Sequence, residues 1–594
     1  MFTDPSLALP ATPYPLAPLP GPGDTLAYAG AARPRPFLLA TGGCSLRGTE
    51  THGVDAAEHA GRLLLAGLAV RGAACGNVLL APAQARRELL TASGSVVETL
   101  LVSAHGVLAE WVGSGPGRGA SELVLVLPGI SARAEGAFLR VDGADGVRLL
   151  QLTPAPEWRL EARGREGVLR AVAALSGPGA ARLALTSGQD LARAEDALRH
   201  LTLMHPARAH AHLTELRARR LATRTGVPEL DDGLAWAVAR LEAALPPGGD
   251  RVHDLAAGEP FPLDPEARRG WTALGAVAAG APVHSLPDVS SPLGMLARAR
   301  LALRAGRRVR TADFSALVAR TDPRPADAAR RTALRAALLE GADALEPWEG
   351  RAAADELRGR ARALADAPAP LTGRAVRLPT VGTSPRLEDA AAAALAAALE
   401  LPGRGPYRAP DADPPRGVLR ALSAWACLNE GQVERGFALY RTHLAEGLAH
   451  GAGLWPEGAR VHDPAAAALV PLVLVHGLLG ARADGHYGRL RLAPRLPGHW
   501  TRFEVGGLVV GDAMVRMVYA REAGRHRFRF VQESGAVPVM LVFEPLLSLA
   551  PTAPVRVDGE PAALDLRPGP PEVGGRVRAA VQLPLDRTRE LLFG

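Results

Sequence analysis

The residues of this chain that are best suited to chemistry are carboxylates that lie close to tryptophans. They occur in three segments, which contain Asp264, Glu266 and Trp271; Glu346, Trp348 and Glu349; and Trp455, Glu457 and His462. Two carboxyl groups on either side of a bond can act as general acid and general base. Tryptophan rings stack on the apolar C–H faces of sugars. Together these residue types predict acid–base chemistry on a carbohydrate.

Glu457 has the most suitable neighbourhood of the candidate acids. Pro456 stiffens its loop, Trp455 offers a platform for a sugar ring, and His462 and Asp463 stand just before the next helical pattern. The alternative interpretation of Glu457 is a side chain that caps or salt-bridges a helix end. The sequence leaves both interpretations open.

The other acids also have a structural alternative. Asp264 and Glu266 precede Trp271, and carboxylates in a first helical turn complement the helix dipole. Glu346 and Glu349 flank Trp348, an arrangement equally typical of a helix junction with solvated carboxylates. Inverting glycoside hydrolysis needs two carboxyl groups about 6.5 to 9.5 Å apart. The partner of Glu457 therefore stays open among these four acids.

The elements that would hold these residues begin with strands. Short runs that alternate apolar and polar residues, separated by Gly and Pro, predict an antiparallel β-sandwich over residues 1–188. The clearest runs are 86–90, 96–102, 107–111 and 122–127. The period becomes helical at Asp190, which predicts two linker helices within residues 189–226, the second ending near Ala222.

Helical spacing dominates residues 227–484. Apolar residues recur three and four positions apart, and Gly or Pro marks the ends. The predicted helices are 230–245, 266–279, 292–305, 326–345, 349–364, 387–401, 416–428, 432–448 and 464–479. This number fits a toroid of helical hairpins, although six complete hairpins would need more helices.

Alternating runs return after Gly480 and predict a C-terminal β-sandwich over residues 485–594. The predicted strands are 489–492, 501–505, 514–519, 525–532, 537–543, 555–557 and 576–583, with a tight turn at Val557-Asp-Gly559.

The order of these segments resembles the six-hairpin glycosidase superfamily, the (α/α) toroid enzymes that include glycogen-debranching proteins and α-L-rhamnosidases. The resemblance rests on Gly453-Leu-Trp-Pro-Glu457, on a helix that ends in Gly477-Leu-Leu-Gly480, and on the strand-rich tail. It covers most of residues 80–594, with specific motifs in the final third. It implies that Glu457 is the general base, which takes a proton from the water that attacks the anomeric carbon.

One segment departs from the pattern of that superfamily. Residues 261–272, Phe-Pro-Leu-Asp-Pro-Glu-Ala-Arg-Arg-Gly-Trp-Thr, look like the early acidic segment of α-L-rhamnosidase-type enzymes. Ala267 and Leu274 stand where that segment carries acids. Glu266 or Asp264 would have to supply the missing acid. The departure also favours a rival hypothesis, a toroid that has lost turnover and acts as a glycan-binding or structural protein.

Composition excludes several other classes of protein. The chain contains no lysine, so P-loop, pyridoxal and lysine-dependent kinase chemistry are excluded. Its net charge of +7 comes from arginines spread among acids, which argues against a nucleic-acid partner. The three cysteines and the histidines at 205, 210 and 212 lack metal-ligand spacing. We expect no cofactor and no metal.

The chain has no signal-peptide pattern and no apolar run of about 18 residues, so we expect a cytoplasmic protein that does not span a membrane. The leading hypothesis is a glycoside hydrolase that acts on an α-linked glucan or oligosaccharide by an inverting, glycogen-debranching-like mechanism. Glu457 would be the base, and one of Glu266, Asp264, Glu346 and Glu349 the acid. Substrate contacts would come from Trp455, Trp271, Trp348 and His462.

Overall fold

The structure is a computed structural model. It describes residues 26–28, 36–41, 44–49, 53–59, 62–81, 83–92, 94–114, 121–129, 131–163, 168–175, 180–203, 220–244, 265–280, 292–308, 310, 314, 328–366, 393–401, 407, 417–449, 455, 463–522, 524–547, 555–562, 565–568, 577–586 and 588–593. The chain divides into two compact units, which are described separately. Unit 1 comprises residues 1–217, 239–257 and 447–454, and unit 2 comprises 218–238, 258–446 and 455–594.

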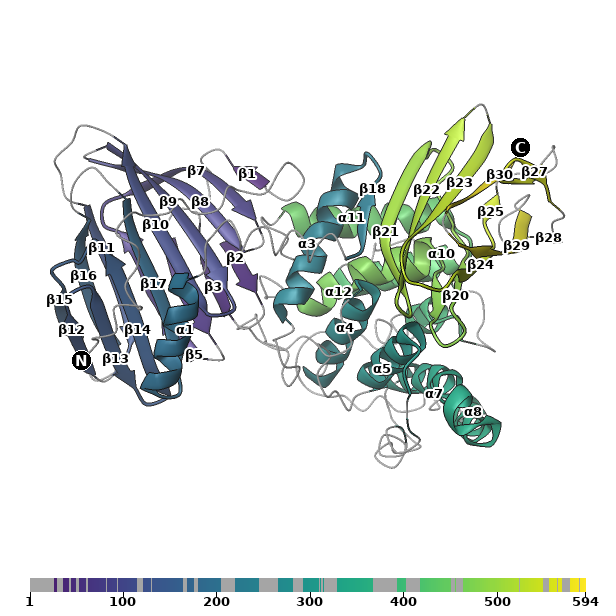
Figure 1. Ribbon diagram of the computed structural model, residues 1–594, viewed down its shortest axis with the longest axis horizontal. Helices are drawn as coiled ribbons and strands as arrows, with labels where there is room; N and C mark the ends of the chain where they lie inside the picture. Colours follow the sequence, from purple (N-terminus) through teal and green to yellow (C-terminus); the bar gives the residue numbers. More distant parts are fainter. Residues whose placement is uncertain are drawn as a thin grey trace, which may run out of the picture. The chain divides into compact units, whose positions relative to one another are not determined.

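Unit 1 is built on two antiparallel sheets (Figure 1). The nine-stranded sheet has the order β1 (Leu26–Tyr28), β7 (Ala74–Ala81), β8 (Gln84–Thr91), β9 (Gly94–Ser103), β10 (Gly106–Ser114), β17 (Ala180–Gly188), β14 (Gly146–Thr153), β13 (Phe138–Gly143) and β12 (Ser131–Glu135). The eight-stranded sheet has the order β15 (Arg159–Arg163), β16 (Val168–Leu175), β11 (Ser121–Pro128), β6 (Gly67–Val70), β4 (Gly53–His59), β3 (Cys44–Thr49) and β2 (Pro36–Thr41), and β5 (Arg62–Leu65) pairs with β4.

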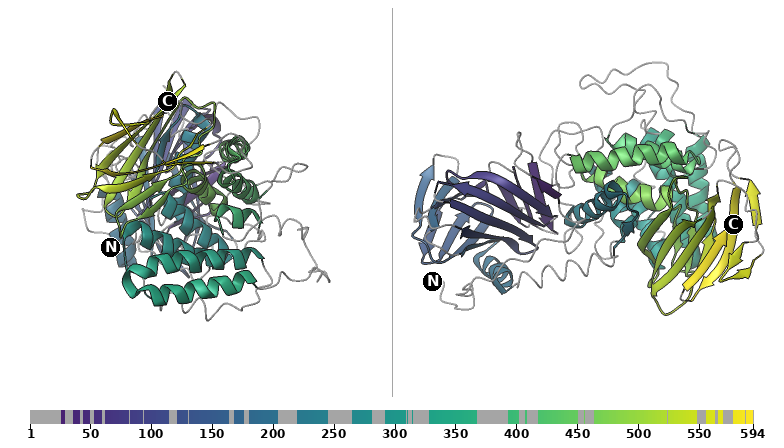
Figure 2. Two further views of the ribbon diagram at one scale, coloured as in Figure 1. Left: turned by 90° about the vertical axis from the view of Figure 1, so that its right-hand side faces the viewer. Right: turned by 90° about the horizontal axis from the view of Figure 1, so that it is seen from above.

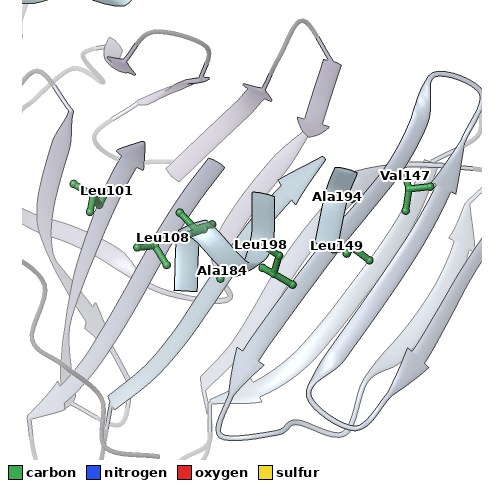
Figure 3. Close-up of a cluster of buried hydrophobic side chains, with 8 residues drawn as sticks. Leu101, Leu108, Val147, Leu149, Ala184, Ala194 and Leu198 are labelled. Atoms are coloured by element: carbon green, nitrogen blue, oxygen red, sulfur yellow. The ribbon is translucent and has the colours of Figure 1, made fainter. Parts of the chain in front are cut away.

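Helix α1 (Leu191–Leu203) covers one face of the nine-stranded sheet. Its Ala194, Leu198 and Leu201 are fully buried against apolar side chains of the sheet, among them Leu108 and Leu149 (Figure 3). The three helical residues lie four and three positions apart, which puts them on one side of the helix. Burial of this stripe fixes α1 on the sheet.

A buried ion pair within the nine-stranded sheet lies against the eight-stranded sheet. Arg87 on β8 donates to Glu98 on β9, and neither side chain is more than 2% exposed. Glu98 also accepts a hydrogen bond from the indole nitrogen of Trp111 at 3.0 Å. From the eight-stranded sheet, the ring of Phe37 lies 5.7 Å from the Arg87 guanidinium and the carbonyl of Thr49 accepts from it. The buried charges are therefore matched and hydrogen-bonded, as burial of ions requires.

Unit 2 contains the helices that the sequence predicts as a toroid (Figure 1). They are α3 (Pro228–Ala244), α4 (Pro265–Ala278), α5 (Pro292–Ala305), α7 (Ala328–Glu349), α8 (Arg351–Asp366), α10 (Gly417–Asn429), α11 (Val433–Ala449) and α12 (Pro464–Leu472). The last residues of α3 and of α11 fall in unit 1. A further helical turn occupies 393–398. Figure 2 shows α7 and α8 side by side; Gly350, with a φ of 86°, makes the sharp turn between them.

Helix α12 packs directly on α4, so the last helix of this region closes on an early one. A Cβ at Gly275 of α4 would lie 2.6 Å from the Cβ of Ala468 on α12, so only a glycine permits this approach. Val277 near the C-terminal end of α4 and Val475 of the π-helical turn that continues α12 line the same cavity. The two helices therefore run parallel, with both N-termini at the opposite end.

Two further sheets complete unit 2. One has the order β18 (Ala222–Arg224), β21 (Arg502–Val510), β22 (Ala513–Glu522), β23 (Arg525–Ser534), β30 (Thr588–Phe593), β26 (Arg556–Val557) and β27 (Glu560–Pro561). The other has the order β19 (Arg482–Asp484), β20 (Arg489–Leu492), β24 (Val539–Phe543), β29 (Val577–Leu585) and β25 (Leu546–Leu547), and β28 (Asp565–Pro568) pairs with β29. Most pairs are antiparallel, but β20 and β24 are parallel.

The predicted fold class is confirmed: antiparallel sheets come first, helices follow, and sheets end the chain. Two details differ. The predicted linker helix ending near Ala222 is wrong there, because 222–224 form a strand that pairs with β21. The helix predicted to run over 464–479 changes character at Val473, where it widens into a π-helix, η3 (Val473–Leu478).

Candidate active site

The segment that contains Glu457 is held at both of its ends. The backbone N–H of Asp463 donates to the carbonyl oxygen of Trp455 at 2.7 Å. Trp455 is 1% exposed, and its indole nitrogen donates to the carbonyl of His443 at 3.2 Å. Residues 456–462, including Glu457 and His462, lie outside the described part of the chain. Their two neighbours are joined and anchored to α11.

Asp463 begins α12. Its backbone is extended, with φ of −117° and ψ of 118°, and its carboxylate accepts from the N–H of Ala465 at 2.8 Å. Pro464 follows at the first helical position, where a missing N–H has no cost. This is the arrangement of an N-cap, at the positive end of the α12 dipole.

Two buried side chains of α11 fix the position of α12. The Tyr440 hydroxyl donates to the carbonyl of Val470 at 2.8 Å. The His443 Nε2 lies 2.9 Å from the carbonyl of Ala466, so this nitrogen carries the proton and donates. Burial lowers the pKa of His443 to about 4, which keeps the ring neutral near pH 7.

Trp271 lies on α4 at the level where α12 begins. Trp271 precedes Gly275 by four residues, and Pro464 precedes Ala468 by four residues. Since the two helices are parallel and touch at Gly275 and Ala468, equal counts put Trp271 level with Pro464. Trp271 is 2% exposed and Trp455 is 1% exposed, so both rings are buried.

The other acids predicted for this region can be placed only in part. Glu266 belongs to the first turn of α4, but its side chain lies outside the described residues, as does all of Asp264. By helix rise, the backbone at Glu266 stands about 7 to 8 Å beyond Trp271, toward the helix start. The catalytic roles of Glu266, Asp264 and Glu457 stay predictions.

Glu346 and Glu349 belong to a different place. Glu346 accepts from Arg358 of α8 at 2.5 Å, and the same guanidinium donates to Asp343 at 2.9 Å. Trp348 is 39% exposed, and its ring meets that of His486 edge-on, with centroids 5.0 Å apart. Their proposed roles in catalysis or binding stay predictions, at a position removed from Trp455.

A cavity of about 440 Å³ lies at the C-terminal ends of the helices, within unit 2. Its charged and polar lining residues are Arg300, Arg304, Glu340, Asp343, Glu400, Asn429, His476, Arg482, Arg491 and Arg495. From Pro464 to His476 the α12 and η3 helices rise by roughly 15 to 18 Å. The cavity is therefore separated from Trp455 and Asp463 by the length of that helix.

The charges of this cavity are tightly paired. Arg300 holds Glu340 through two hydrogen bonds of 2.7 Å each. Glu400 is bound by Arg495 and Arg482. Burial disfavours the ionised Glu400, yet the surrounding arginines, Arg495 first, hold its pKa below the usual value. Glu400 therefore stays ionised.

His476 is neutral in the same cavity. Burial, followed by the charge of Arg300, puts its pKa well below the usual value. Its Nδ1 lies 3.0 Å from the carbonyl of Ala481, so Nδ1 donates and Nε2 is an acceptor. No sequence motif marks this cavity, since its lining residues come from five helices, α4, α5, α7, α10 and η3, and three strands, β19, β20 and β21, which meet only in the fold.

No family model matches the chain, and no curated protein matches it. Solved structures are similar to it at low identity. A protein described as a kojibiose phosphorylase from the human microbiome is 8% identical over 95% of this chain and 92% of its own, with a TM-score of 0.48. A bacterial glucoamylase complexed with acarbose is 8% identical over 78% of this chain and 96% of its own, with a TM-score of 0.48.

An α-L-rhamnosidase of Streptomyces avermitilis, complexed with L-rhamnose, is 12% identical over 96% of this chain and 71% of its own, with a TM-score of 0.40. It is the order of sheets and helices in this chain that supports the resemblance to the six-hairpin glycosidase superfamily. Among the described residues, no helix is long and apolar enough to cross a membrane.

Proposed function

We propose that this chain is a glycoside hydrolase that acts on an α-linked glucan or oligosaccharide by an inverting, two-carboxylate mechanism. The observation that carries the proposal is the parallel packing of α4 and α12. It brings the start of α12, where the Glu457 segment attaches, level with Trp271 of α4. The acidic segment with Asp264 and Glu266 leads into that same end of α4.

Chain length supports Glu457 as the base. Glu457 is two positions after the anchored Trp455, and two residues of chain span at most about 7 Å. The neighbouring N-terminus of α12 favours an ionised carboxylate. In this role Glu457 removes a proton from a water molecule, whose oxygen attacks the anomeric carbon from the face opposite the leaving group.

Glu266 or Asp264 is the acid in this proposal. It donates its proton to the glycosidic oxygen as the bond to the anomeric carbon breaks, so one proton is taken from water and one is given to the leaving sugar. Glu346 and Glu349 fit less well. Glu346 is one helical turn from Asp343, which lines the cavity at the far end of α12. An inverting pair stands about 6.5 to 9.5 Å apart, whereas α12 and η3 together span roughly 15 to 18 Å.

The test measures reducing-sugar release from glycogen, pullulan and aryl α-glycosides. We expect Glu457→Gln to lower kcat by about 100- to 10,000-fold, and Glu266→Gln or Asp264→Asn to do the same. Glu522→Gln, which alters an exposed carboxylate on β22, is the matched control and should leave kcat unchanged. Activity that survives Glu457→Gln removes this residue from the mechanism. Loss of activity in Glu346→Gln, with Glu266→Gln and Asp264→Asn unaffected, would move the acid to the other end of the helices.

A second candidate function is glycan binding without turnover. It is favoured by Ala267 and Leu274 at positions where α-L-rhamnosidase-type enzymes carry acids, and by the burial of the Trp271 and Trp455 rings. This function predicts that glycogen binds while no reducing sugar is released. Product release by the wild type, abolished in Glu457→Gln, decides against it.

A further inference from the structure

The exposed aromatic side chains of unit 2 gather at one place. Of the large hydrophobic side chains described there, Trp348, Tyr487 and Val537 are exposed, and the two aromatic ones are linked through His486. The His486 ring lies 5.0 Å from that of Trp348 and 4.7 Å from that of Tyr487, both edge-on. Tyr487 is 66% exposed. We call Trp348, His486 and Tyr487 the aromatic patch.

The aromatic patch is rigidly placed by the fold. Tyr487 and His486 belong to the turn between β19 and β20, and the N–H of Gly485 in that turn donates to the carbonyl of Leu303 at 2.6 Å. A Cβ at Gly485 would lie 2.3 Å from the carbonyl oxygen of Arg304, so the turn sits directly on the end of α5. Aromatic rings held by a docked turn lose little freedom when a ligand stacks on them.

The aromatic patch adjoins the cavity. Asp343, five residues before Trp348 on α7, lines the cavity, and so does Ala483, three residues before His486. The volume of about 440 Å³ falls within the range of small-molecule sites, roughly 300 to 1,000 Å³. Exposed rings beside a hollow with polar walls are a chemically suitable arrangement for a sugar chain.

The electrostatics of the cavity favour a neutral ligand over an anion. Five arginines and three carboxylates line it, an excess of two positive charges. The C-terminal ends of α4, α5, α10 and η3 contribute to the same lining, and each such end carries roughly half a negative charge. These two contributions nearly cancel. With little net charge, the cavity offers hydrogen-bond donors on its guanidinium groups and acceptors on its carboxylates and on Nε2 of His476. These match sugar hydroxyl groups, which both donate and accept.

We propose that the aromatic patch and the adjoining cavity form a second carbohydrate-binding site, which takes a neutral oligosaccharide and is distinct from the site of bond cleavage. Sugar rings stack on Trp348 and Tyr487, and hydroxyl groups reach the polar wall of the cavity. The site lies at the C-terminal ends of the helices and does not require Glu457. Its role is to hold a polymeric substrate on the protein.

The test is affinity electrophoresis in gels that contain glycogen, pullulan, yeast mannan or hydroxyethyl cellulose, followed by calorimetry with maltohexaose or the oligosaccharide of whichever polymer retards the protein. All variants carry Glu457→Gln, so that turnover does not remove the ligand. We expect Trp348→Ala and Tyr487→Ala each to raise Kd by roughly two- to tenfold. Trp348→Phe should lie between the wild type and Trp348→Ala.

Val537→Ala is the matched control, because this side chain has the same exposed fraction as Tyr487, 66%, and belongs to the same unit. The proposal is overturned if no polymer retards the protein, or if the aromatic variants bind every polymer as the control does. It is also overturned if Trp348→Ala changes only self-association measured by sedimentation, which would assign the patch to a protein contact. Binding by these variants, together with no reducing-sugar release by the wild-type protein, would keep this proposal and refute the hydrolase.

Discussion

His443→Gln should reduce the amount of stability that unit 2 loses as the pH falls below 7. His443 is buried, and its pKa in the folded protein is lowered to about 4, whereas an unfolded chain binds the same proton with a pKa of about 6.5. At a pH between these two pKa values, His443 binds a proton in the unfolded state but not in the folded state. Stability is therefore lost as the pH falls from about 7 to 4.

The size of this loss follows from the two pKa values. At pH 5 the unfolded histidine is almost fully protonated and the folded one is almost fully neutral. The difference amounts to about 2 kcal/mol relative to pH 8, and it reaches about 3 kcal/mol below pH 4. Glutamine does not titrate, yet its amide can still donate to the carbonyl of Ala466, which His443 Nε2 contacts at 2.9 Å.

Urea unfolding followed by tryptophan fluorescence at pH 5, 6, 7 and 8 measures the effect. The ring of Trp455 lies 6.4 Å from that of His443, so it reports on the same region. We expect the free energy of unfolding of the variant to fall about 2 kcal/mol less than that of the wild type between pH 8 and pH 5. His499→Gln, at a side chain that is 64% exposed, is the control. Curves for His443→Gln and wild type that stay parallel across this range would refute the reasoning.

Further substitutions test the stability of the fold. Gly275→Ala should lower the free energy of unfolding by about 1 to 3 kcal/mol, because its Cβ would lie 2.6 Å from an atom of α12. Gly359→Ala on α8, where no atom lies within 4 Å of the added Cβ, should raise it by roughly 0.5 to 1 kcal/mol, so the two variants should shift the thermal midpoint in opposite directions. Asp463→Ala should cost about 0.5 to 2 kcal/mol through loss of the cap, and Asp463→Ser should restore most of it, as measured by urea unfolding. Glu98→Ala should destabilise unit 1 by about 3 to 5 kcal/mol, because it leaves a buried guanidinium unpaired; unchanged protease resistance of unit 1 would contradict this.

Much of the fold can be predicted from the sequence because it rests on local periodicity. The helix predicted over 292–305 has the bounds Pro292–Ala305, and the strand predicted over 489–492 is Arg489–Leu492. The predicted turn at Asp558 and Gly559 is confirmed by positive φ values of 52° and 89°, as a two-residue hairpin needs. In each case neighbouring residues alone decide the conformation.

The predictions that differ depend on contacts between distant residues. Ala222 follows a helical pattern in the sequence, but the edge of β21, nearly three hundred residues later, offers hydrogen bonds that a strand satisfies. The boundary near Glu349 is displaced because α7 continues through Pro347 and stops only at Gly350. The sequence leaves the acid that would partner Glu457 open between the acids near Trp271 and those beside Trp348. The fold separates Trp348 from Trp455 because they lie toward opposite ends of the helices.

The direction of the helices accounts for this separation. Helices α4 and α12 are parallel, so their partial positive ends lie on the side of Trp271 and Asp463 and their partial negative ends lie toward the cavity. An ionised base is favoured at the first end, where Asp463 already caps α12. Arginines are favoured at the second, where five of them line the cavity. Acid–base chemistry and binding of neutral glycans would then occupy opposite ends of one set of helices, and a substitution at either end should leave the other function intact.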